Sequence, residues 1–286
     1  MSQATPPELN PPPVAKRRIV KILTCIVLCG LLVFIAMSAQ TLWAEWSLLG
    51  RQRSQVRATT IIGYRGISPR LSQAQRPDEW FRVEKDQTFL WAGWKHGVGH
   101  VWFRVASGDV DRGRISAPMG REVIPTIDVP LIENADGPIG KSIPDETPVV
   151  GLQFAGIHSV YPVLILEKVL VVNDSIADQP FLVLNNPLAD APEKTVVYQP
   201  KIDVHRLTMS FSGFALDKRP VFFDRETESL WVQADQALLA ISGKHKGQRL
   251  PEIARLAPLT WTRWRSAHPG SRLLVGANRD PTPPKL

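Results

Sequence analysis

The chain has 286 residues, of which 44% are apolar and 21% are charged, and this balance is typical of a globular protein. Its formal net charge of +7 suits an anionic surface such as lipid headgroups. No compact run of Lys and Arg follows residue 21, however, so nucleic-acid binding is not expected. Both cysteines, Cys25 and Cys29, lie in an apolar segment, which excludes a disulfide, a thiolate metal site and a cysteine nucleophile from the rest of the chain.

The N-terminal region is predicted to hold the chain in a membrane. Residues 1–18 contain prolines at positions 6, 7, 11, 12 and 13 and are expected to form a disordered cytoplasmic tail. Residues 19–42 are predicted to be a transmembrane helix, because 22–39 contain neither charge nor proline and nearly cross a hydrocarbon core of about 30 Å. A cleaved signal peptide, with a weak cleavage site at 36–38, is the alternative, but its apolar stretch would be shorter.

The residues that flank this segment indicate its orientation. The basic residues that precede it place the N-terminus in the cytoplasm and the domain outside: Lys16, Arg17, Arg18 and Lys21. Trp43 and Trp46 follow it, where indole rings favour the interface, but arginines at 51, 53 and 57 weaken the charge bias. We therefore expect a single-pass protein that contacts the lipid bilayer through residues 19–42. Whether the domain also has a protein partner is left open.

The rest of the chain is predicted to be mainly β, of the α+β class. Residues 43–76 are polar and Arg-rich and are expected to form a juxtamembrane stalk, and residues 77–123 an N-terminal β subregion with a turn at Gly97 and Gly99. Residues 124–276 contain short runs of Val, Phe and Leu between turn residues, and the run 159–174 is included in this β pattern. One short helix is predicted over 259–268, and residues 277–286 are expected to be a free tail.

Several longer motifs carry a family resemblance. They are IPTIDVPLIE (124–133), IPDETPVVGLQFAGIHSVYPVLIL (143–166), VVND (171–174), FSGFAL (211–216), DRETESLW (224–231) and LPEIARLAPLTWTRWRSAHPGSRLLVG (250–276). In order and spacing these motifs resemble a bacterial family called domain of unknown function 3179, over about 150 residues. The resemblance implies a β-rich domain that is often exported or membrane-attached. It implies no reaction, because the family has no established activity.

This chain departs from the family pattern at two places. Typical members look as though they carry His-Glu where this chain has Val169-Leu170, and Cys-Pro-Leu-Cys where it has Asn186-Pro187-Leu188-Ala189. A histidine and a Cys-x-x-Cys pair suit a soft metal or a redox pair. We infer that these positions form one site in ordinary members and that this chain lacks it. Val169, Asn186, Ala189 and Asp224 should then line one pocket.

The candidate pocket is centred on the charged run from Asp224 to Glu228. On a strand, alternation would place the three carboxylates on one face, as an acid–base hydrolase or a hard-cation site requires. On a turn, Asp224 and Thr227 would instead cap each other's backbone. The residues that make up the candidate pocket are Asp224, Arg225, Glu226, Glu228, Asn173, Asp174 and Asn186. The pair Asn173-Asp174 ends an apolar run and is also typical of a turn.

His96 and His100 are the candidate metal ligands. The two nearby glycines disfavour a helix, but the histidines could converge on a hairpin that Trp91, Trp94 and Trp102 surround. The alternative is a surface hairpin with aromatic packing. No Glu follows His96, so the pattern of a zinc hydrolase is absent.

The sequence thus favours a non-catalytic binding or scaffolding module at the membrane surface, and no cofactor is expected. The alternative is a metal- or haem-dependent enzyme or electron carrier that uses His96 and His100.

Overall fold

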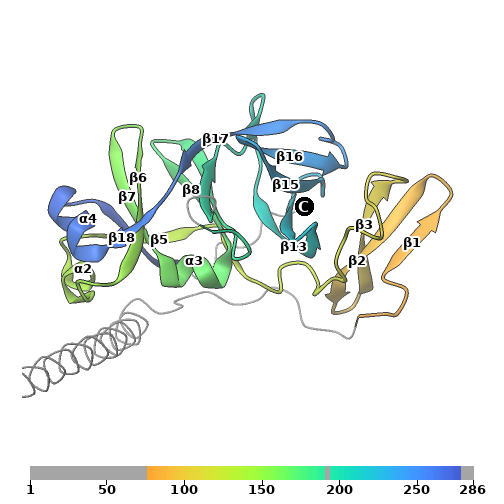
Figure 1. The fold of residues 1–286 in the computed structure, drawn as a ribbon, viewed down its shortest axis with the longest axis horizontal. Coiled ribbons are helices and arrows are strands. Elements are labelled where there is room, and N and C mark those ends of the chain that lie inside the picture. Colours follow the sequence, from red (N-terminus) through yellow and green to blue (C-terminus); the bar gives the residue numbers. More distant parts are fainter. Residues whose placement is uncertain (1–75, 191–193, 278–286) are drawn as a thin grey trace, which may run out of the picture. The chain divides into compact units, whose positions relative to one another are not determined.

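The computed structural model describes residues 76–190 and 194–277, which all belong to one compact unit, Ser54–Leu286. The predicted tail, the transmembrane helix and nearly all of the stalk lie outside the described residues. The described chain is mainly β with a short C-terminal helix, which confirms the predicted fold class for this part (Figure 1). None of its helices combines the length and the apolar character that crossing a membrane requires.

A three-stranded antiparallel sheet begins the described chain. Its strands follow the order of the sequence and are β1 (Phe81–Glu84), β2 (Gln87–Lys95) and β3 (Gly99–Ala106). Lys95 pairs with Gly99, so the hairpin turns at residues 96–98, which confirms the predicted turn. Gly97 has a φ of +76°, a left-handed conformation that residues with a side chain rarely adopt.

A nine-stranded sheet forms the centre of the fold. Its order is β13-β14-β15-β16-β17-β10-β9-β8-β4, and all neighbours are antiparallel except β4 and β8. The strands are β4 (Thr126–Ile127), β8 (Val171–Ile176), β9 (Gln179–Asn185), β10 (Thr195–Tyr198), β13 (Met209–Leu216), β14 (Arg219–Asp224), β15 (Leu230–Ala234), β16 (Ala237–Ser242) and β17 (Arg249–Arg255). A two-stranded ribbon of β11 (Lys201–Ile202) and β12 (His205–Arg206) connects β10 to β13.

This sheet closes on itself. The amide group of Asn173 on β8 donates to the backbone oxygen of Met209 on β13 at 2.9 Å, and its Oδ1 accepts from the Met209 N–H at 3.0 Å. The hydroxyls of Thr126 and Ser210 lie 2.8 Å apart and join β4 to β13 in the same way. The two ends of the strand order therefore meet, and an apolar interior lies between them.

A five-stranded mixed sheet follows the order β18-β6-β7-β19-β5, in which only β7 and β19 are parallel. Its strands are β5 (Pro130–Asn134), β6 (Pro148–Phe154), β7 (Ile157–Pro162), β18 (Pro258–Thr260) and β19 (Arg272–Ala277). The helices are α2 (Pro138–Ser142), α3 (Val163–Val169) and α4 (Trp261–Ala267). Helix α4 confirms the helix predicted over 259–268.

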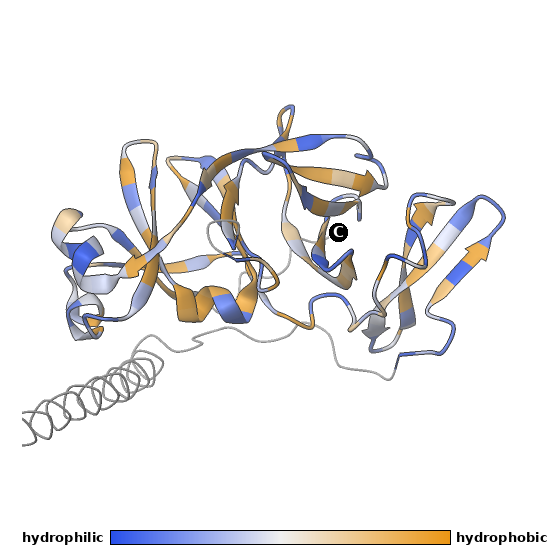
Figure 2. Ribbon diagram, in the orientation of Figure 1, coloured by the Kyte–Doolittle hydropathy of each residue, from blue (hydrophilic) through white to orange (hydrophobic). Residues whose placement is uncertain are grey.

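Helix α3 corrects the sequence prediction, which included residues 163–169 in the β pattern. Ile165, Leu166 and Val169 are fully buried, and their spacing places them on one helix face. Pro162 at the N-cap has extended backbone, and Leu170 ends the helix with a left-handed φ of +56°. A continuous apolar run fits a buried helix as well as a buried strand, so its periodicity does not distinguish them. Figure 2 shows the hydrophobic colouring of α3.

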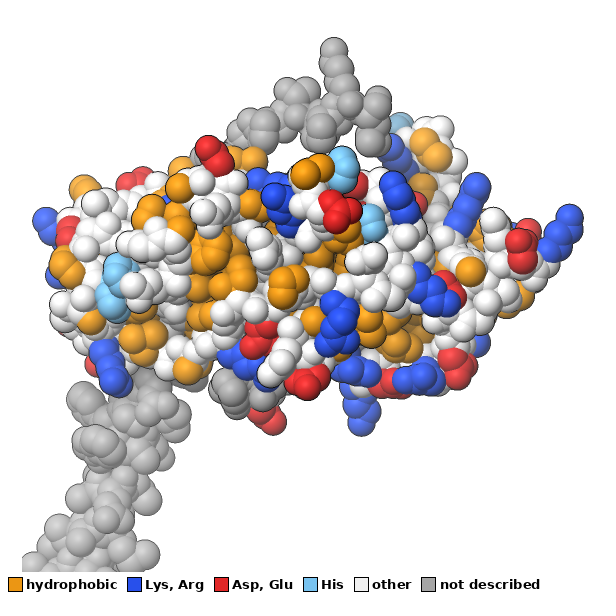
Figure 3. All heavy atoms as spheres, turned by 90° about the horizontal axis from the view of Figure 1, so that it is seen from above, with side chains coloured by type: hydrophobic (Ala, Val, Ile, Leu, Met, Phe, Trp, Pro, Cys, Tyr) orange, Lys and Arg blue, Asp and Glu red, His pale blue; other side chains and the backbone are white. Residues whose placement is uncertain are grey.

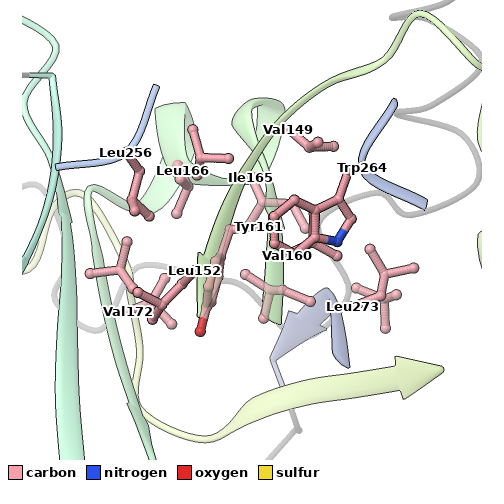
Figure 4. Close-up of a cluster of buried hydrophobic side chains, with 14 of the residues drawn as sticks. Val149, Leu152, Val160, Tyr161, Ile165, Leu166, Val172, Leu256, Trp264 and Leu273 are labelled. Atoms are coloured by element: carbon pink, nitrogen blue, oxygen red, sulfur yellow. The ribbon is translucent and has the colours of Figure 1, made fainter. Parts of the chain in front are cut away.

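Three apolar clusters hold these layers together. The first joins the five-stranded sheet, α3 and α4 to β8 and β9, and Figure 4 shows Tyr161 and Trp264 within it. The second fills the closed nine-stranded sheet around Phe222 and Trp231. The third joins β1–β3 to the outer face of β13–β15 through Phe214 and Phe223. The third cluster thus crosses the predicted boundary at residue 124, and the domain boundaries stay predictions.

We expect Gly151→Ala to destabilise the fold by about 1–3 kcal/mol, because overpacking a core forces side chains from their preferred positions. A Cβ at Gly151 would lie 1.8 Å from the Trp264 ring. Gly113→Ala is the matched control, since its Cβ would meet only Asp111 Oδ1 at 3.4 Å. Urea denaturation followed by tryptophan fluorescence measures both variants. Equal stability of the two would contradict this packing.

Candidate functional site

The charged run after β14 forms a turn. Asp224 is fully buried, and its Oδ1 accepts hydrogen bonds from the backbone N–H and the hydroxyl of Thr227, both at 2.7 Å. Its Oδ2 accepts a hydrogen bond from the indole N–H of Trp231 at 2.9 Å. Of the two arrangements that the sequence left open, the structure has the turn. Asp224 thus fastens this turn to Trp231 on β15.

The other two carboxylates of the run have different partners. Both oxygens of Glu226 accept from the backbone N–H of Thr208, at 2.9 and 3.1 Å. Glu228 accepts from Arg121 at 2.5 Å. The three carboxylates therefore do not converge as an acid–base pair requires. Within residues 76–190 and 194–277, no group of three or more His, Cys, Asp or Glu side chains has the geometry to hold a metal.

Arg225 is the centre of a half-buried polar cluster. Its Nε donates to Glu122 at 2.6 Å and its Nη1 donates to Asp128 at 2.7 Å. The amide of Asn173 also donates to Asp128, at 2.9 Å, so Arg225 and Asn173 meet through this carboxylate. Burial opposes the charge of Arg225, but Glu122 and Asp128 outweigh burial and raise the pKa of Arg225 above its ordinary value. The guanidinium stays charged.

Sequence reasoning brought Arg225 and Asn173 into one candidate pocket but missed the two carboxylates between them. Glu122 and Asp128 lie 103 and 97 residues before Arg225. No local pattern marks either residue as a partner, because the contact depends on how the chain segment 121–128 passes over the closed sheet. The motif around Asp128 was part of the family resemblance, and this was the one signal available.

Asp174 belongs to a second polar cluster. Its Oδ2 accepts from the Tyr161 hydroxyl at 2.9 Å, and its Oδ1 accepts from Arg272 at 3.1 Å. Asn173 and Asp174 lie inside β8, which corrects the prediction that they form a turn. Successive strand residues point to opposite faces, so Asn173 reaches β13 whereas Asp174 reaches the five-stranded sheet. Hydrogen bonds to both side chains allow two polar residues to occupy a buried strand.

Asn186 belongs to a third group of polar side chains. Its amide donates to Gln233 on β15 at 2.8 Å, and its Oδ1 accepts from the Leu188 N–H at 2.9 Å. Gln233 in turn donates to the Tyr198 hydroxyl at 3.3 Å. The backbone N–H of Asn185 donates to the backbone oxygen of Leu170 at 2.8 Å. The end of β9 therefore lies beside the end of α3.

The side chains at three positions of the single-site hypothesis have different contacts. Val169 packs in the apolar cluster of the five-stranded sheet, whereas Asn186 contacts Gln233 and Asp224 contacts Thr227 and Trp231. The backbones next to Val169 and Asn186 approach each other, but these two side chains and Asp224 have different partners, and the single-site hypothesis stays a prediction.

The two candidate metal ligands lie on the β2–β3 hairpin. The indole N–H of Trp91 donates to Nδ1 of His100 at 2.9 Å. The proton of a neutral His100 is then on Nε2, so neither ring nitrogen offers a free lone pair. His96 packs edge-on against Trp94, with ring centroids 5.8 Å apart. The arrangement thus has the aromatic packing of a surface hairpin, and a metal would have to displace the Trp91 hydrogen bond.

The family described as "Protein of unknown function (DUF3179)" matches residues 121–282, which is more than half of the chain, and the chain belongs to this family. No curated protein and no solved structure matches the chain.

Arg225→Lys should lower the free energy of unfolding by about 1–3 kcal/mol, because one ammonium group cannot replace two guanidinium hydrogen bonds to half-buried carboxylates. Arg219→Lys is the control, since Arg219 is exposed at the start of β14, the strand that precedes Arg225, and should change stability by less than about 0.5 kcal/mol. Urea denaturation at neutral pH gives both values. An unchanged midpoint for Arg225→Lys would show that the cluster contributes little.

Tyr161→Phe should alter stability in two ways. At neutral pH it leaves Oδ2 of the buried Asp174 without the Tyr161 donor and should cost about 1–3 kcal/mol. Burial, reinforced by Asp174, raises the pKa of Tyr161 well above its usual value. The unfolded tyrosine ionises near pH 10, so the stability of the native chain falls as pH rises above 10.

The variant removes this group, so its stability should fall less steeply above pH 10, as urea midpoints at pH 7, 10 and 11 would show. Tyr198, whose pKa burial raises to about 12, contributes to the same fall and remains in the variant. Parallel pH profiles for the native chain and the variant would contradict the assignment.

Proposed function

We propose that the chain is a single-pass membrane protein that presents its β-rich domain on the extracytoplasmic side as a non-catalytic binding or scaffolding module. The tether is inferred from the apolar, uncharged run 22–39, which basic residues precede and tryptophans follow.

The distribution of charge supports the tether. Residues 1–75 contain nine basic and two acidic residues, so they account for the whole excess of +7. The described residues contain 23 basic and 23 acidic side chains. In Figure 3, Lys and Arg side chains are accordingly interspersed with Asp and Glu side chains over the visible face. The positive charge that suits anionic headgroups is thus concentrated around the predicted helix.

The non-catalytic part of the proposal rests on the hydrogen bonds that the polar side chains in the family-matched region make. Asp224, Glu226, Arg225, Asp174 and Asn186 each hold a turn, a strand or another element through hydrogen bonds. A catalytic carboxylate must instead reach a substrate proton or a bound cation. These side chains therefore serve the fold, and a role in binding falls to exposed surfaces.

The alternative, a metal- or haem-dependent protein that uses His96 and His100, is less favoured, since Trp91 occupies Nδ1 of His100. Elemental analysis and an absorption spectrum of the purified chain distinguish the two. Stoichiometric metal or a Soret band that is lost in the His96→Ala, His100→Ala variant would overturn the non-catalytic proposal.

The proposed topology predicts that a reporter fused to the C-terminus lies outside the cytoplasm. Alkaline phosphatase in that position should be active and green fluorescent protein should be dark, and alkaline carbonate should leave the chain in the membrane fraction. Replacement of Lys16, Arg17, Arg18 and Lys21 by Gln should lower the phosphatase activity, because it removes the charge bias that orients the helix. Lys16→Arg with Lys21→Arg, which keeps all four positive charges, is the charge-conserving control. A fluorescent, carbonate-soluble fusion would disprove the tether and the orientation.

A further inference from the structure

The turn of the β2–β3 hairpin lies at one end of the three-stranded sheet. The chain that follows the predicted membrane segment enters the sheet at this same end. Phe81 pairs with Leu90, and the Trp91 N–H donates to the oxygen of Trp80 at 2.8 Å. The beginning of β1 therefore lies beside the half of β2 that leads to Lys95 and the turn (Figure 1). The chain therefore enters the three-stranded sheet at the end that carries the hairpin turn.

The hairpin tip, Trp94–His100, has the composition of an interfacial membrane contact. Val98 is 65% exposed at the turn, and its N–H donates to the backbone oxygen of Lys95, an exposed residue that follows the half-buried Trp94. No acidic residue occurs from Gln87 to Gly108, so the whole hairpin is positively charged. Tryptophan favours the headgroup region, a basic side chain is attracted to anionic lipid, and an exposed valine gains by leaving water.

The shape of the tip is fixed before any contact. Gly97 and Gly99 adopt positive φ angles of +76° and +89°, which hold Val98 at the apex. The Trp91–His100 hydrogen bond fastens the base of the turn. Farther from the turn, Arg82 lies over the ring of Trp102 at 4.4 Å, which keeps a second basic group beside the hairpin. A preformed tip loses little conformational entropy when it binds.

We propose that the hairpin tip docks on the headgroup region of the membrane that anchors the chain, with an anionic phospholipid surface as its partner. This inference rests on the proposed tether. Residues 43–75 can span at most roughly 115 Å when fully extended, so the proposed tether would limit how far the start of the domain can move from the bilayer. Docking is then intramolecular in effect, and contacts that would be too weak for a free protein suffice.

The test uses the full chain with Cys25→Ser and Cys29→Ser, so that one new cysteine can carry an environment-sensitive fluorophore. The label is placed by Val98→Cys, or by Val204→Cys as the matched control, because Val204 is another exposed valine, 79% accessible, in the β11–β12 ribbon. Both chains are reconstituted in vesicles of phosphatidylcholine with phosphatidylglycerol, or of phosphatidylcholine alone. The readouts are flotation with the vesicles and quenching by brominated acyl chains.

We expect the label at position 98 to be blue-shifted and quenched in the anionic vesicles, whereas the label at 204 stays aqueous. Lys95→Glu should lower the docked fraction by roughly fivefold or more, because it reverses a charge at the lipid surface. Lys201→Glu, which reverses an exposed charge on β11, should leave the docked fraction unchanged.

The outcomes separate the two proposals. A chain that floats with its label at 98 as aqueous as that at 204 overturns the docking alone. Quenching that is insensitive to both phosphatidylglycerol and Lys95→Glu also overturns it, since the anionic surface would not be the partner. A chain that does not float overturns the tether, and the docking inference with it.

Discussion

The closure of the nine-stranded sheet depends on the side chain of Asn173. Strand β4 covers only Thr126 and Ile127, so the ladder at this end of the sheet stops after two residues. Asn173 continues the closure with one amide donor and one oxygen acceptor, both bonded to the backbone of Met209. A buried side chain thus replaces the pair of hydrogen bonds that a neighbouring strand would supply. Loss of either bond would leave buried backbone groups unpaired, which is costly in an apolar interior.

The polar clusters follow from this closure. The second N–H of the Asn173 amide bonds Asp128, and Asp128 together with Glu122 receives Arg225 from the turn after β14. The N–H of Glu122 donates to the oxygen of Phe211 on β13, and the N–H of Arg121 donates to the oxygen of Ala92 on β2. One connected set of bonds therefore links the ends of the closed sheet to the three-stranded sheet. The cluster of Arg225, Glu122 and Asp128 serves to join elements, and its half-buried position explains why its opposite charges are paired.

Local chemistry accounts for the features that the sequence predicted correctly. The β2–β3 turn follows from Gly97 and Gly99, and helix α4 begins after a proline and ends before Pro269-Gly270. Helix α3 was missed because it is short and five of its seven residues are apolar, so only Glu167 and Lys168 mark its exposed face and the periodicity is too weak to identify a helix. Asn173-Asp174 was assigned to a turn because polar residues after an apolar run usually end a strand. Only distant partners, Met209 and Tyr161, make their burial in β8 possible.

The sequence by itself determined that the chain is mainly β, that it belongs with a particular family, and that its positive charge is concentrated in the N-terminal quarter, around an apolar segment of membrane-spanning length. These properties are local or additive, so they can be counted along the chain. The tertiary structure alone decided that Asp224, Glu226 and Glu228 bond to three different partners, and that Val169 and Asn186 contact different neighbours although their backbones approach. The physical reason is that a hydrogen bond requires a partner within about 3 Å. Over separations near a hundred residues, only the folded path of the chain determines which partner that is.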